Sequence, residues 1–431
     1  MENATLFCLL IMLCLSFFMN KGFLNSTTLF IGAFTFVTFM ANLHLFGLYS
    51  FSDSAYKIIL LGCSFFLFGS LIHKVLSLST RTSNRAISHL QVNPTQNSEL
   101  IFNYRIFMLL QIISLFCITA VFIQAVTLLL SGDTLGFIRT MFKSNNDEGF
   151  FSNNDLLTIF WILIVVPTVY LSLPILLYNI FDRKQNSLLF VLTMVNISMY
   201  VISSAGRVLL ICTLVYILLL KKRFGFTLSK KQKFSLAVGG GILLGYACFV
   251  TVIRAGERTP FEYLYHYFAA PLPLLSYWTA NAETNNIQTY GEAFFFGFIG
   301  LLNRASRFLN MESTFNNVYD AIAITEFNYL PIFATRKYNA FVTCFYYFYI
   351  DFRFVGVMVG SLFYGFVSQW MYTKSKVSYD PRYFVLYLLF MQSIVFSIVR
   401  WQFGETKYFL SFIYMIIILF SGKSTMRGKA K

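Results

Sequence analysis

The chain is organised around one long interruption of its apolar runs, residues 254–353, which read RAGERTPFEYLYHYFAAPLPLLSYWTANAETNNIQTYGEAFFFGFIGLLNRASRFLNMESTFNNVYDAIAITEFNYLPIFATRKYNAFVTCFYYFYIDFR. We refer to these residues as the block. The flanking runs are long enough to cross a bilayer, so the whole block must lie on one side of a membrane. The block also holds eight of the 18 acidic residues of the chain. We therefore expect any chemistry to take place there.

The composition predicts an all-α polytopic membrane protein. Hydrophobic residues make up 57% of the chain and charged residues only 12%, and the mean hydropathy is +0.66. Soluble domains have about 25% charged residues. The first apolar run lacks the basic start and the cleavage site of a signal peptide, so we expect it to be a span. The seven cysteines show no CxxC pair and are interpreted as buried thiols.

Eleven spans are predicted, and their odd number puts the two termini on opposite sides. They cover about residues 4–19, 27–49, 56–72, 106–131, 156–179, 188–202, 208–220, 234–253, 354–372, 383–399 and 408–421. One set of connections carries 20 Lys and Arg residues and the other 13, which predicts a cytoplasmic C-terminus and an exterior block. The expected domains are an eight-span bundle (1–253), the large loop (254–353), and three spans with a basic tail (354–431).

The net charge of +15 is explained by the basic residues that this topology places in the cytoplasmic links. No nucleic-acid partner is needed to account for it. Basic cytoplasmic links orient the spans and meet anionic lipid head groups. No basic patch stands apart from the loops, so we expect no nucleic-acid partner. Nucleotide-binding and hydrolase motifs of the types GxxxxGK[ST], GxGxxG and GxSxG are missing from the sequence.

Residues 188–220 form one apolar run with a single charge, Arg207. A straight helix of this length would be about 50 Å long, against a hydrocarbon core of about 30 Å. We therefore predict two short spans that turn at 203–207, where Gly206 permits the turn. Arg207 then either snorkels from a helix end or binds an anion near the block.

Three apolar segments of the block are too short to span a membrane, at about 261–278, 293–302 and 340–350. Helices of this kind, rich in Phe and Tyr, can lie along the membrane interface. Tyr263, His266, Tyr267 and Ala270 have the i, i+3, i+4, i+7 spacing of one helical face. A site beside such helices suits a substrate with an apolar tail and a polar head.

The basic residues of the block are six arginines and one lysine, a composition suited to binding pyrophosphate. Arg254, Glu257 and Arg258 would share one side of a continued helix. They form either a salt-bridged helix end or a carboxylate base between two anion-binding groups. Arg304 and Arg307 repeat the spacing, with the same two alternatives. His266 is the only histidine expected outside, so a His-rich metal site is not predicted.

Several of these features together resemble the O-antigen polymerases, the Wzy-type oligosaccharide repeat-unit polymerases. They are the Gly206-Arg207 turn, a basic cytoplasmic link, a span ending in Arg254, the long loop, and the motifs Tyr338-Asn339-Ala340-Phe341, Tyr349-Ile350-Asp351-Phe352 and Gly356. The residue motifs are confined to about 203–223 and 329–365. Relatives often have Gly where this chain has Arg353, which leaves open whether Asp351 does more than shape the turn.

The resemblance implies a fold similar to the GT-C-like multi-spanning glycosyltransferases and a reaction on the periplasmic face of a Gram-negative inner membrane. A growing glycan on undecaprenyl pyrophosphate would be transferred onto a fresh lipid-linked repeat unit, without a nucleotide sugar, a metal or another cofactor. Glu257 is the candidate base, with Arg254 and Arg258 beside it. The other candidate substrate-binding residues are Arg207, Arg304, Arg307, Arg336, Tyr338, Asn339 and Asp351.

Two other functions remain open. An O-antigen ligase would share the topology and differ in its acceptor. A flippase or transporter should have internal repeats and short exterior links, neither of which this sequence shows. The expected partners are the lipid-linked oligosaccharide and membrane lipids, and a regulator of chain length is left open.

Overall fold

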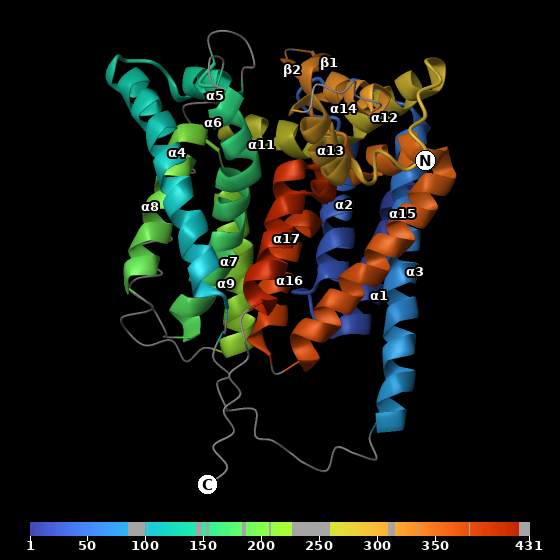
Figure 1. Ribbon diagram of the computed structural model, residues 1–431. Helices are drawn as coiled ribbons and strands as arrows, with labels where there is room; N and C mark the ends of the chain where they lie inside the picture. Colours follow the sequence, from blue (N-terminus) through green and yellow to red (C-terminus); the bar gives the residue numbers. More distant parts are fainter. Residues whose placement is uncertain are drawn as a thin grey trace. The chain divides into compact units, whose positions relative to one another are not determined.

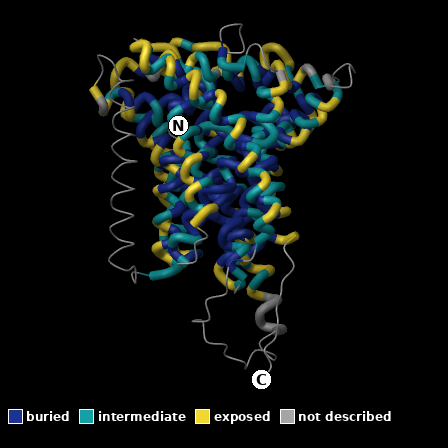
Figure 2. The backbone as a smooth tube through the Cα atoms, turned by 60° about the vertical axis from the view of Figure 1, so that its left-hand side comes forward, coloured by how far each residue is buried: buried dark blue, intermediate teal, exposed yellow. Residues whose placement is uncertain are grey.

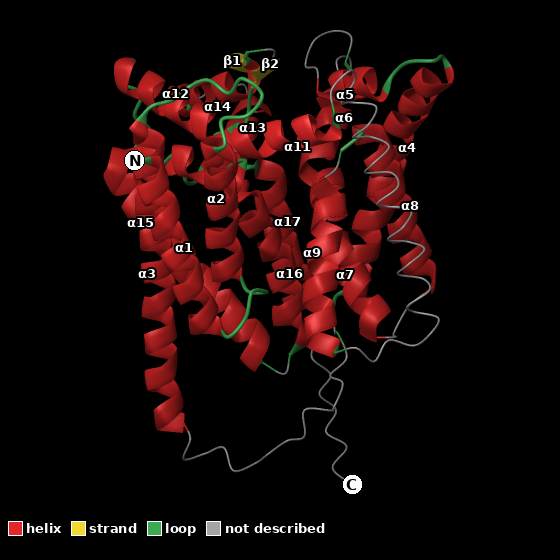
Figure 3. Cartoon of the chain, turned by 180° about the vertical axis from the view of Figure 1, so that it is seen from behind, coloured by secondary structure: helices red, strands yellow, loops and turns green. Residues whose placement is uncertain are grey.

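The computed structural model describes residues 1–84, 100, 102–143, 149–151, 155–182, 187–206, 208–225, 259–308, 315–334, 336–378 and 380–421. This part of the chain is helical apart from connecting segments and one two-stranded antiparallel sheet (Figure 3). Seven of its helices are long and apolar enough to cross a membrane. The predicted all-α membrane class is confirmed, and the number of spans and their orientation stay predictions.

The chain divides into two compact units, of which the first contains residues 1–95, 258–377 and 390–406. Its long helices are α1 (Glu2–Asn20), α2 (Ser26–Asn42), α3 (Asp53–Asn84) and α15 (Thr343–Val377). The block contributes α11 (Pro260–Ala269), α12 (Pro271–Thr284), α13 (Phe296–Phe308), α14 (Asn316–Phe327), β1 (Leu330–Phe333) and β2 (Arg336–Tyr338). These block elements gather at one end of the long helices (Figure 1). Short turns of 3₁₀-helix follow at η2 (Phe396–Ile398) and η3 (Gln402–Gly404).

Helices α3 and α15 pack closely because glycines face the partner backbone. A Cβ atom on Gly69 would lie 2.0 Å from the Leu362 carbonyl oxygen, and one on Gly365 would lie 2.0 Å from that of Phe66. Neither position can accept a larger side chain without moving the helices apart. Such close approach through small residues is typical of helices packed in membranes. Figure 2 marks buried positions in dark blue and exposed ones in yellow along the backbone.

A buried polar network joins the four long helices at the end away from the block. The Asn20 amide nitrogen donates to Asn25 Oδ1 at 3.1 Å, and the Gln369 amide nitrogen donates to Asn20 Oδ1 at 3.1 Å. Thr27 Oγ1 lies 3.2 Å from both Ser70 Oγ and Gln369 Oε1. Because each buried polar group finds a partner, the network fixes the relative register of the helices.

The second helix ends earlier than the sequence predicted. The expected span ran to residue 49, but α2 ends at Asn42, and residues 43–52 turn to meet the block. His44, Phe46 and Gly47 have positive φ angles there, which end the helix. Tyr49 N donates to the Ile332 carbonyl oxygen at 3.0 Å, so this loop extends the small sheet.

The second unit contains residues 96–257, 378–389 and 407–431. Its described elements are α4 (Tyr104–Leu130), α5 (Leu135–Lys143), α6 (Asp155–Phe160), the π-helical turn η1 (Trp161–Val165), α7 (Val166–Asp182), α8 (Ser187–Ser204) and α9 (Val208–Phe224). Helix α16 (Pro381–Val395) begins in this unit, and α17 (Thr406–Phe420) lies in it except for its first residue. The predicted span at 234–253 lies outside the described residues.

The break predicted in the apolar run 188–220 is confirmed, because α8 ends at Ser204 and α9 begins at Val208. The residue that permits it differs from the expected one. Ala205 has the positive φ angle of 43°, whereas Gly206 does not have one. The sequence suggested Gly206 because glycine adopts such angles most readily. Arg207 lies outside the described residues.

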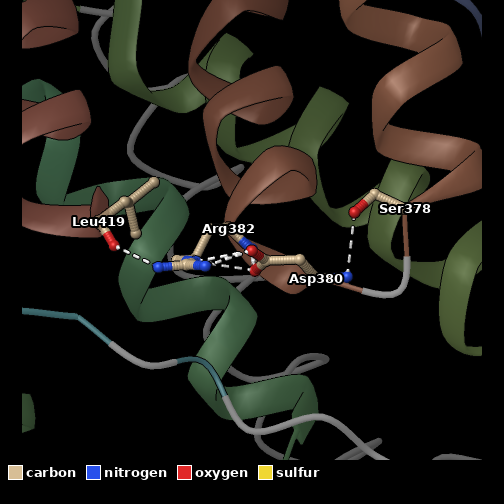
Figure 4. Close-up of polar contacts among 4 residues, drawn as sticks. All are labelled: Ser378, Asp380, Arg382 and Leu419. Atoms are coloured by element: carbon tan, nitrogen blue, oxygen red, sulfur yellow. Dashed lines mark hydrogen bonds and ion pairs between the residues drawn. The ribbon is translucent and has the colours of Figure 1, made fainter. Parts of the chain in front are cut away.

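The N-terminal end of α16 and the C-terminal end of α17 are joined by Arg382 (Figure 4). Its Nε donates to both Asp380 carboxylate oxygens, at 2.9 and 2.7 Å, and its Nη1 lies 3.4 Å from the Leu419 carbonyl oxygen. Ser378 Oγ accepts a hydrogen bond from Asp380 N. Arg382 thereby meets an unpaired carbonyl at the end of α17, where a cation is favourable.

Candidate functional site

Asp351 is the centre of a cluster of hydrogen bonds that shapes residues 289–294. We call Asp351 and this loop the knot. Its Oδ1 accepts from Thr289 Oγ1 at 2.6 Å, Gly291 N at 2.9 Å and Ala293 N at 3.0 Å, and its Oδ2 accepts from Phe294 N at 2.8 Å. The residue is 2% exposed. A buried carboxylate with four donors is engaged by the protein itself. This geometry favours the turn-shaping alternative for Asp351 over direct substrate binding.

The knot lies where α15 is sharply kinked. Phe352 and Arg353 have non-helical backbone angles, with φ 54° and ψ −137° at Arg353. A Cβ on Gly356 would lie 2.0 Å from the Phe348 carbonyl oxygen, although residues eight apart in a straight helix are separated by about 12 Å along its axis. The segment 343–351 therefore folds back onto the start of the longer part of α15.

Arg353 occupies a backbone conformation that glycine adopts readily and other residues adopt rarely. Its side chain makes two contacts that stabilise the kink. Nη2 donates to the Ala282 carbonyl oxygen at 3.1 Å, and the guanidinium carbon lies 5.6 Å from the centroid of the Tyr349 ring. The Tyr349 hydroxyl in turn donates to the Glu283 carboxylate. The arginine thus ties α12 to the kink.

The predicted short segment at 340–350 differs from an interfacial helix in its burial. Every residue from Thr343 to Asp351 is buried in the first unit, so this part of α15 has no side left for lipid head groups. Helix α11 is different, because Phe261 and Leu264 are 56% and 51% exposed on it. An interfacial position for α11 stays a prediction.

Glu292 is the acidic group that the knot brings next to Asp351. It is half-buried, and its backbone N–H donates to the Thr289 carbonyl oxygen at 2.9 Å. Burial first, and the negative charge of Asp351 second, raise the pKa of Glu292 above its usual value. Carboxyl groups with raised pKa values on a rigid loop are candidates for acid–base chemistry.

The raised pKa of Glu292 gives a pH-dependent prediction. The folded state holds the proton of Glu292 more tightly than the unfolded state, so the charged carboxylate costs stability at neutral pH. This cost disappears as the pH falls below the usual pKa of 4.5. Glu292→Gln should therefore raise the melting temperature at neutral pH, and the advantage over the wild type should vanish near pH 4. Thermal unfolding of both proteins at the two pH values measures this, and equal melting temperatures at neutral pH would contradict it.

Of the four residues of the predicted aromatic face, three are buried and Tyr267 is half-buried, and one of them, His266, contacts two further polar side chains. Tyr263, His266 and Ala270 are buried. His266 Nδ1 lies 2.9 Å from the Tyr338 hydroxyl of β2, and its Nε2 lies 3.9 Å from Glu262 Oε1. The imidazole also packs on the Phe333 ring, with centroids 4.0 Å apart. His266 is thus packed and hydrogen-bonded, and it fixes β2 against α11.

Arg400 pairs with two carboxylates, and the next residue, Trp401, donates its indole N–H to the Phe294 carbonyl oxygen at 2.8 Å. The Arg400 Nη1 lies 2.5 Å from Glu326 Oε1 of α14 and also pairs with Glu405. Burial acts to lower the pKa of Arg400, but the two carboxylates outweigh it and hold that pKa well above the usual range. The backbone next to Arg400 is also tied to the start of α15, since the Val399 carbonyl oxygen accepts from Val342 N and Thr343 N at 3.1 Å.

The remaining site residues proposed from the sequence fall into two groups. Arg254, Glu257 and Arg258 lie outside the described residues, as does Arg207, and the side chain of Arg307 is likewise not described. The second group consists of residues that the structure describes: Arg304, Arg336, Tyr338 and Asn339.

Arg304 Nη1 donates to the Gly300 carbonyl oxygen at 3.0 Å and lies 3.3 Å from Thr406 Oγ1, so one arm of this guanidinium group is bound to the protein. Arg336 is exposed on β2. Asn339 donates its amide to the Glu326 carbonyl oxygen, which gives it a structural partner. Of these residues, Arg336 has the side chain most open to an anionic ligand.

Two site residues were missed in the sequence. Glu262 had a local signal, because Thr259-Pro260-Phe261-Glu262 is a capping box with proline in the first turn, and Thr259 Oγ1 accepts from Glu262 N at 3.2 Å. Glu292 had no local signal, since its neighbour Asp351 comes from a distant part of the chain. Within the described residues, no group of three or more His, Cys, Asp or Glu side chains is arranged to hold a metal ion.

Comparisons of the chain with protein-family models, with curated proteins and with solved structures find no match.

Proposed function

We propose that this chain is a membrane-embedded glycosyltransferase that polymerises oligosaccharide repeat units carried on undecaprenyl pyrophosphate. The observation that carries the proposal is the placement of the charged block at one end of the apolar helices of the first unit. Helices α11 and α12 contact α2, α3 and α15 there. Charged groups beside apolar helices suit a substrate that has a lipid tail and a pyrophosphate head.

The proposed reaction needs two kinds of group. The acceptor hydroxyl oxygen of the new repeat unit attacks the anomeric carbon of the donor glycan, and the bond to the pyrophosphate oxygen breaks with its electron pair. Arginines that hold the pyrophosphate stabilise this leaving group. A carboxylate takes the proton of the acceptor hydroxyl, a step that typically contributes about 10²–10⁴-fold to the rate.

The residues for these roles come from the block, except for Arg207, which precedes it in the sequence. The pyrophosphate-binding set is proposed to consist of Arg207, Arg254, Arg258, Arg304, Arg307 and Arg336. Glu257 is the candidate base from its spacing, and Glu292 is a second candidate from its position beside Asp351 and its raised pKa. The proposed location is the inner membrane of a Gram-negative bacterium, with the block in the periplasm.

The direct test is to incubate the purified chain with one synthetic lipid-linked repeat unit. Dimers and longer oligomers are expected, together with release of undecaprenyl pyrophosphate. Glu292→Gln and Glu257→Ala, assayed separately, decide between the two bases, since only loss of the true base should slow polymerisation about 100-fold or more. Asp320→Asn serves as the control because Asp320 is exposed on α14.

A strain that lacks the native enzyme separates the competing functions. Loss of a polymerase leaves surface polysaccharide with single repeat units, whereas loss of a ligase leaves none. Restoration of the full ladder by this chain supports the proposal. If the purified protein gives no product, and if the strain that lacks the native enzyme shows no surface polysaccharide at all, a ligase or a transporter is favoured instead.

A further inference from the structure

A group of lysines gathers at the end of the first unit away from the block. We call it the lysine cluster, and its members are Lys21, Lys74, Lys374 and Lys376. They come from the C-terminal end of α1, from α3 and from the last turns of α15. Lys74 lies within electrostatic reach of both Lys21 and Lys376. Helix C-termini attract cations, and Lys74 accordingly donates to the Met19 carbonyl oxygen at the end of α1.

The described acids of this unit do not neutralise the cluster. They lie at the start of α1 and α3, in the block, or beside Arg400: Glu2, Asp53, Glu262, Glu283, Glu292, Asp320, Glu326, Asp351 and Glu405. Asp380, the next acid along the chain after α15, is paired with Arg382. The cluster therefore keeps a concentrated positive charge with no described carboxylate of its own unit beside it.

A buried polar atom accompanies the cluster. His73 precedes Lys74 and is only 8% exposed, and its Nδ1 has no hydrogen-bond partner among the described residues. It lies within electrostatic reach of Lys374. The His73 ring packs against the Phe366 ring of α15, with centroids 5.2 Å apart, so this imidazole joins α3 to α15 next to Lys74.

Apolar surface continues directly from the lysines along the same helices. Phe18 of α1 is 74% exposed and Val75 of α3 is 64% exposed. On α15, Trp370 is 39% exposed and stands one helical turn from Lys374, on the same face. Positive charge next to exposed apolar side chains matches a phosphate head group followed by acyl chains.

We propose that the lysine cluster binds the head group of an anionic phospholipid, whose acyl chain runs past Trp370. The site lies at the opposite end of the first unit from the proposed reaction. It therefore selects lipid in the membrane leaflet that the block does not face.

Trp370 provides a direct probe, because the other three tryptophans of the chain are 1–4% exposed. Phosphatidylglycerol with brominated acyl chains is titrated into the detergent-solubilised full chain, and quenching of tryptophan fluorescence is recorded. Quenching is expected at lower concentrations than with brominated phosphatidylcholine. Trp370→Phe should remove the difference between the two lipids.

Lys374→Gln together with Lys376→Gln tests the head-group contact, since both side chains are exposed and their loss should leave the fold intact. The phosphatidylglycerol concentration for half-maximal quenching should rise about 30-fold, from the usual effect of two lysines at a membrane surface. Lys57→Gln with Lys337→Gln removes the same charge from exposed positions at the other end of the unit and should change nothing.

Three results would overturn the proposal. The first is equal quenching by the two lipids in the wild type, and the second is an equal loss of binding in both double variants. The third is displacement of the lipid by inorganic phosphate at millimolar concentration, which would make the cluster a site for free phosphate.

Discussion

Asp351→Asn should lower the free energy of unfolding by about 2–4 kcal/mol, because one acceptor oxygen of a buried knot becomes an amide donor. In the wild type, Oδ2 accepts the Phe294 N–H at 2.8 Å. An NH₂ group at that place would face this N–H with nothing to accept it, and the other orientation of the amide would face the three donors to Oδ1. Thermal or denaturant unfolding of the purified chain in detergent measures the loss.

The effect should be local to the loop that the carboxylate holds. Backbone amides of residues 289–294 should exchange hydrogen faster in Asp351→Asn, while those of α3 and the longer part of α15 should not. Asp320→Asn is the matched control, since it makes the same chemical change at an exposed position. Equal stability of the two variants would mean that Asp351 does not organise this loop.

Arg400→Met should lower the free energy of unfolding by about 1–3 kcal/mol, because Glu326 and Glu405 would lose their shared counter-charge. Removing one partner of a fully buried pair costs about 3–5 kcal/mol. The smaller value applies here because the two carboxylate side chains are 36% and 31% exposed, where solvent screens the repulsion. Unfolding experiments on the purified chain measure the difference.

The pH dependence of this loss follows from the raised pKa of Arg400. A base with a raised folded-state pKa contributes its full stability at every pH below its ordinary pKa, which for arginine lies well into the alkaline range. The loss in Arg400→Met should therefore be constant from neutral to mildly alkaline pH. Glu326→Gln or Glu405→Gln should each cost less, because one carboxylate still pairs with the arginine. A single glutamine variant as damaging as Arg400→Met would refute the shared pairing.

The helices could be predicted from the sequence because their signals are local. Hydropathy located α1, α4, α8 and α9 within a few residues, and the excess length of the run 188–220 placed the break between the last two. The prediction failed at the end of α2, where the helix stops at Asn42 and Phe46 packs against aromatic rings of α11 instead of continuing the helix. Hydropathy detects apolar side chains without detecting what they pack against.

The site was predicted less completely because its contacts join distant parts of the chain. Thr289 and Asp351 are 62 residues apart, and no sequence pattern links a carboxylate to the amides of a loop at that distance. The motif around Asp351 singled out this residue, but the choice between shaping a turn and binding a substrate needed the four donors. The face of α11 was predictable because helical periodicity is a local property.

The kink of α15 bears on how the chain is made and inserted. Thirty-five residues of straight helix would measure about 50 Å, far more than a bilayer accommodates, so the segment 343–351 cannot simply be threaded through the lipid with the rest. The ribosome delivers the loop 289–294 before it delivers Asp351, and the loop's N–H donors must stay hydrated until that carboxylate arrives. Docking of the segment onto this loop therefore has to follow the synthesis of Asp351 and cannot be completed while the loop alone has emerged.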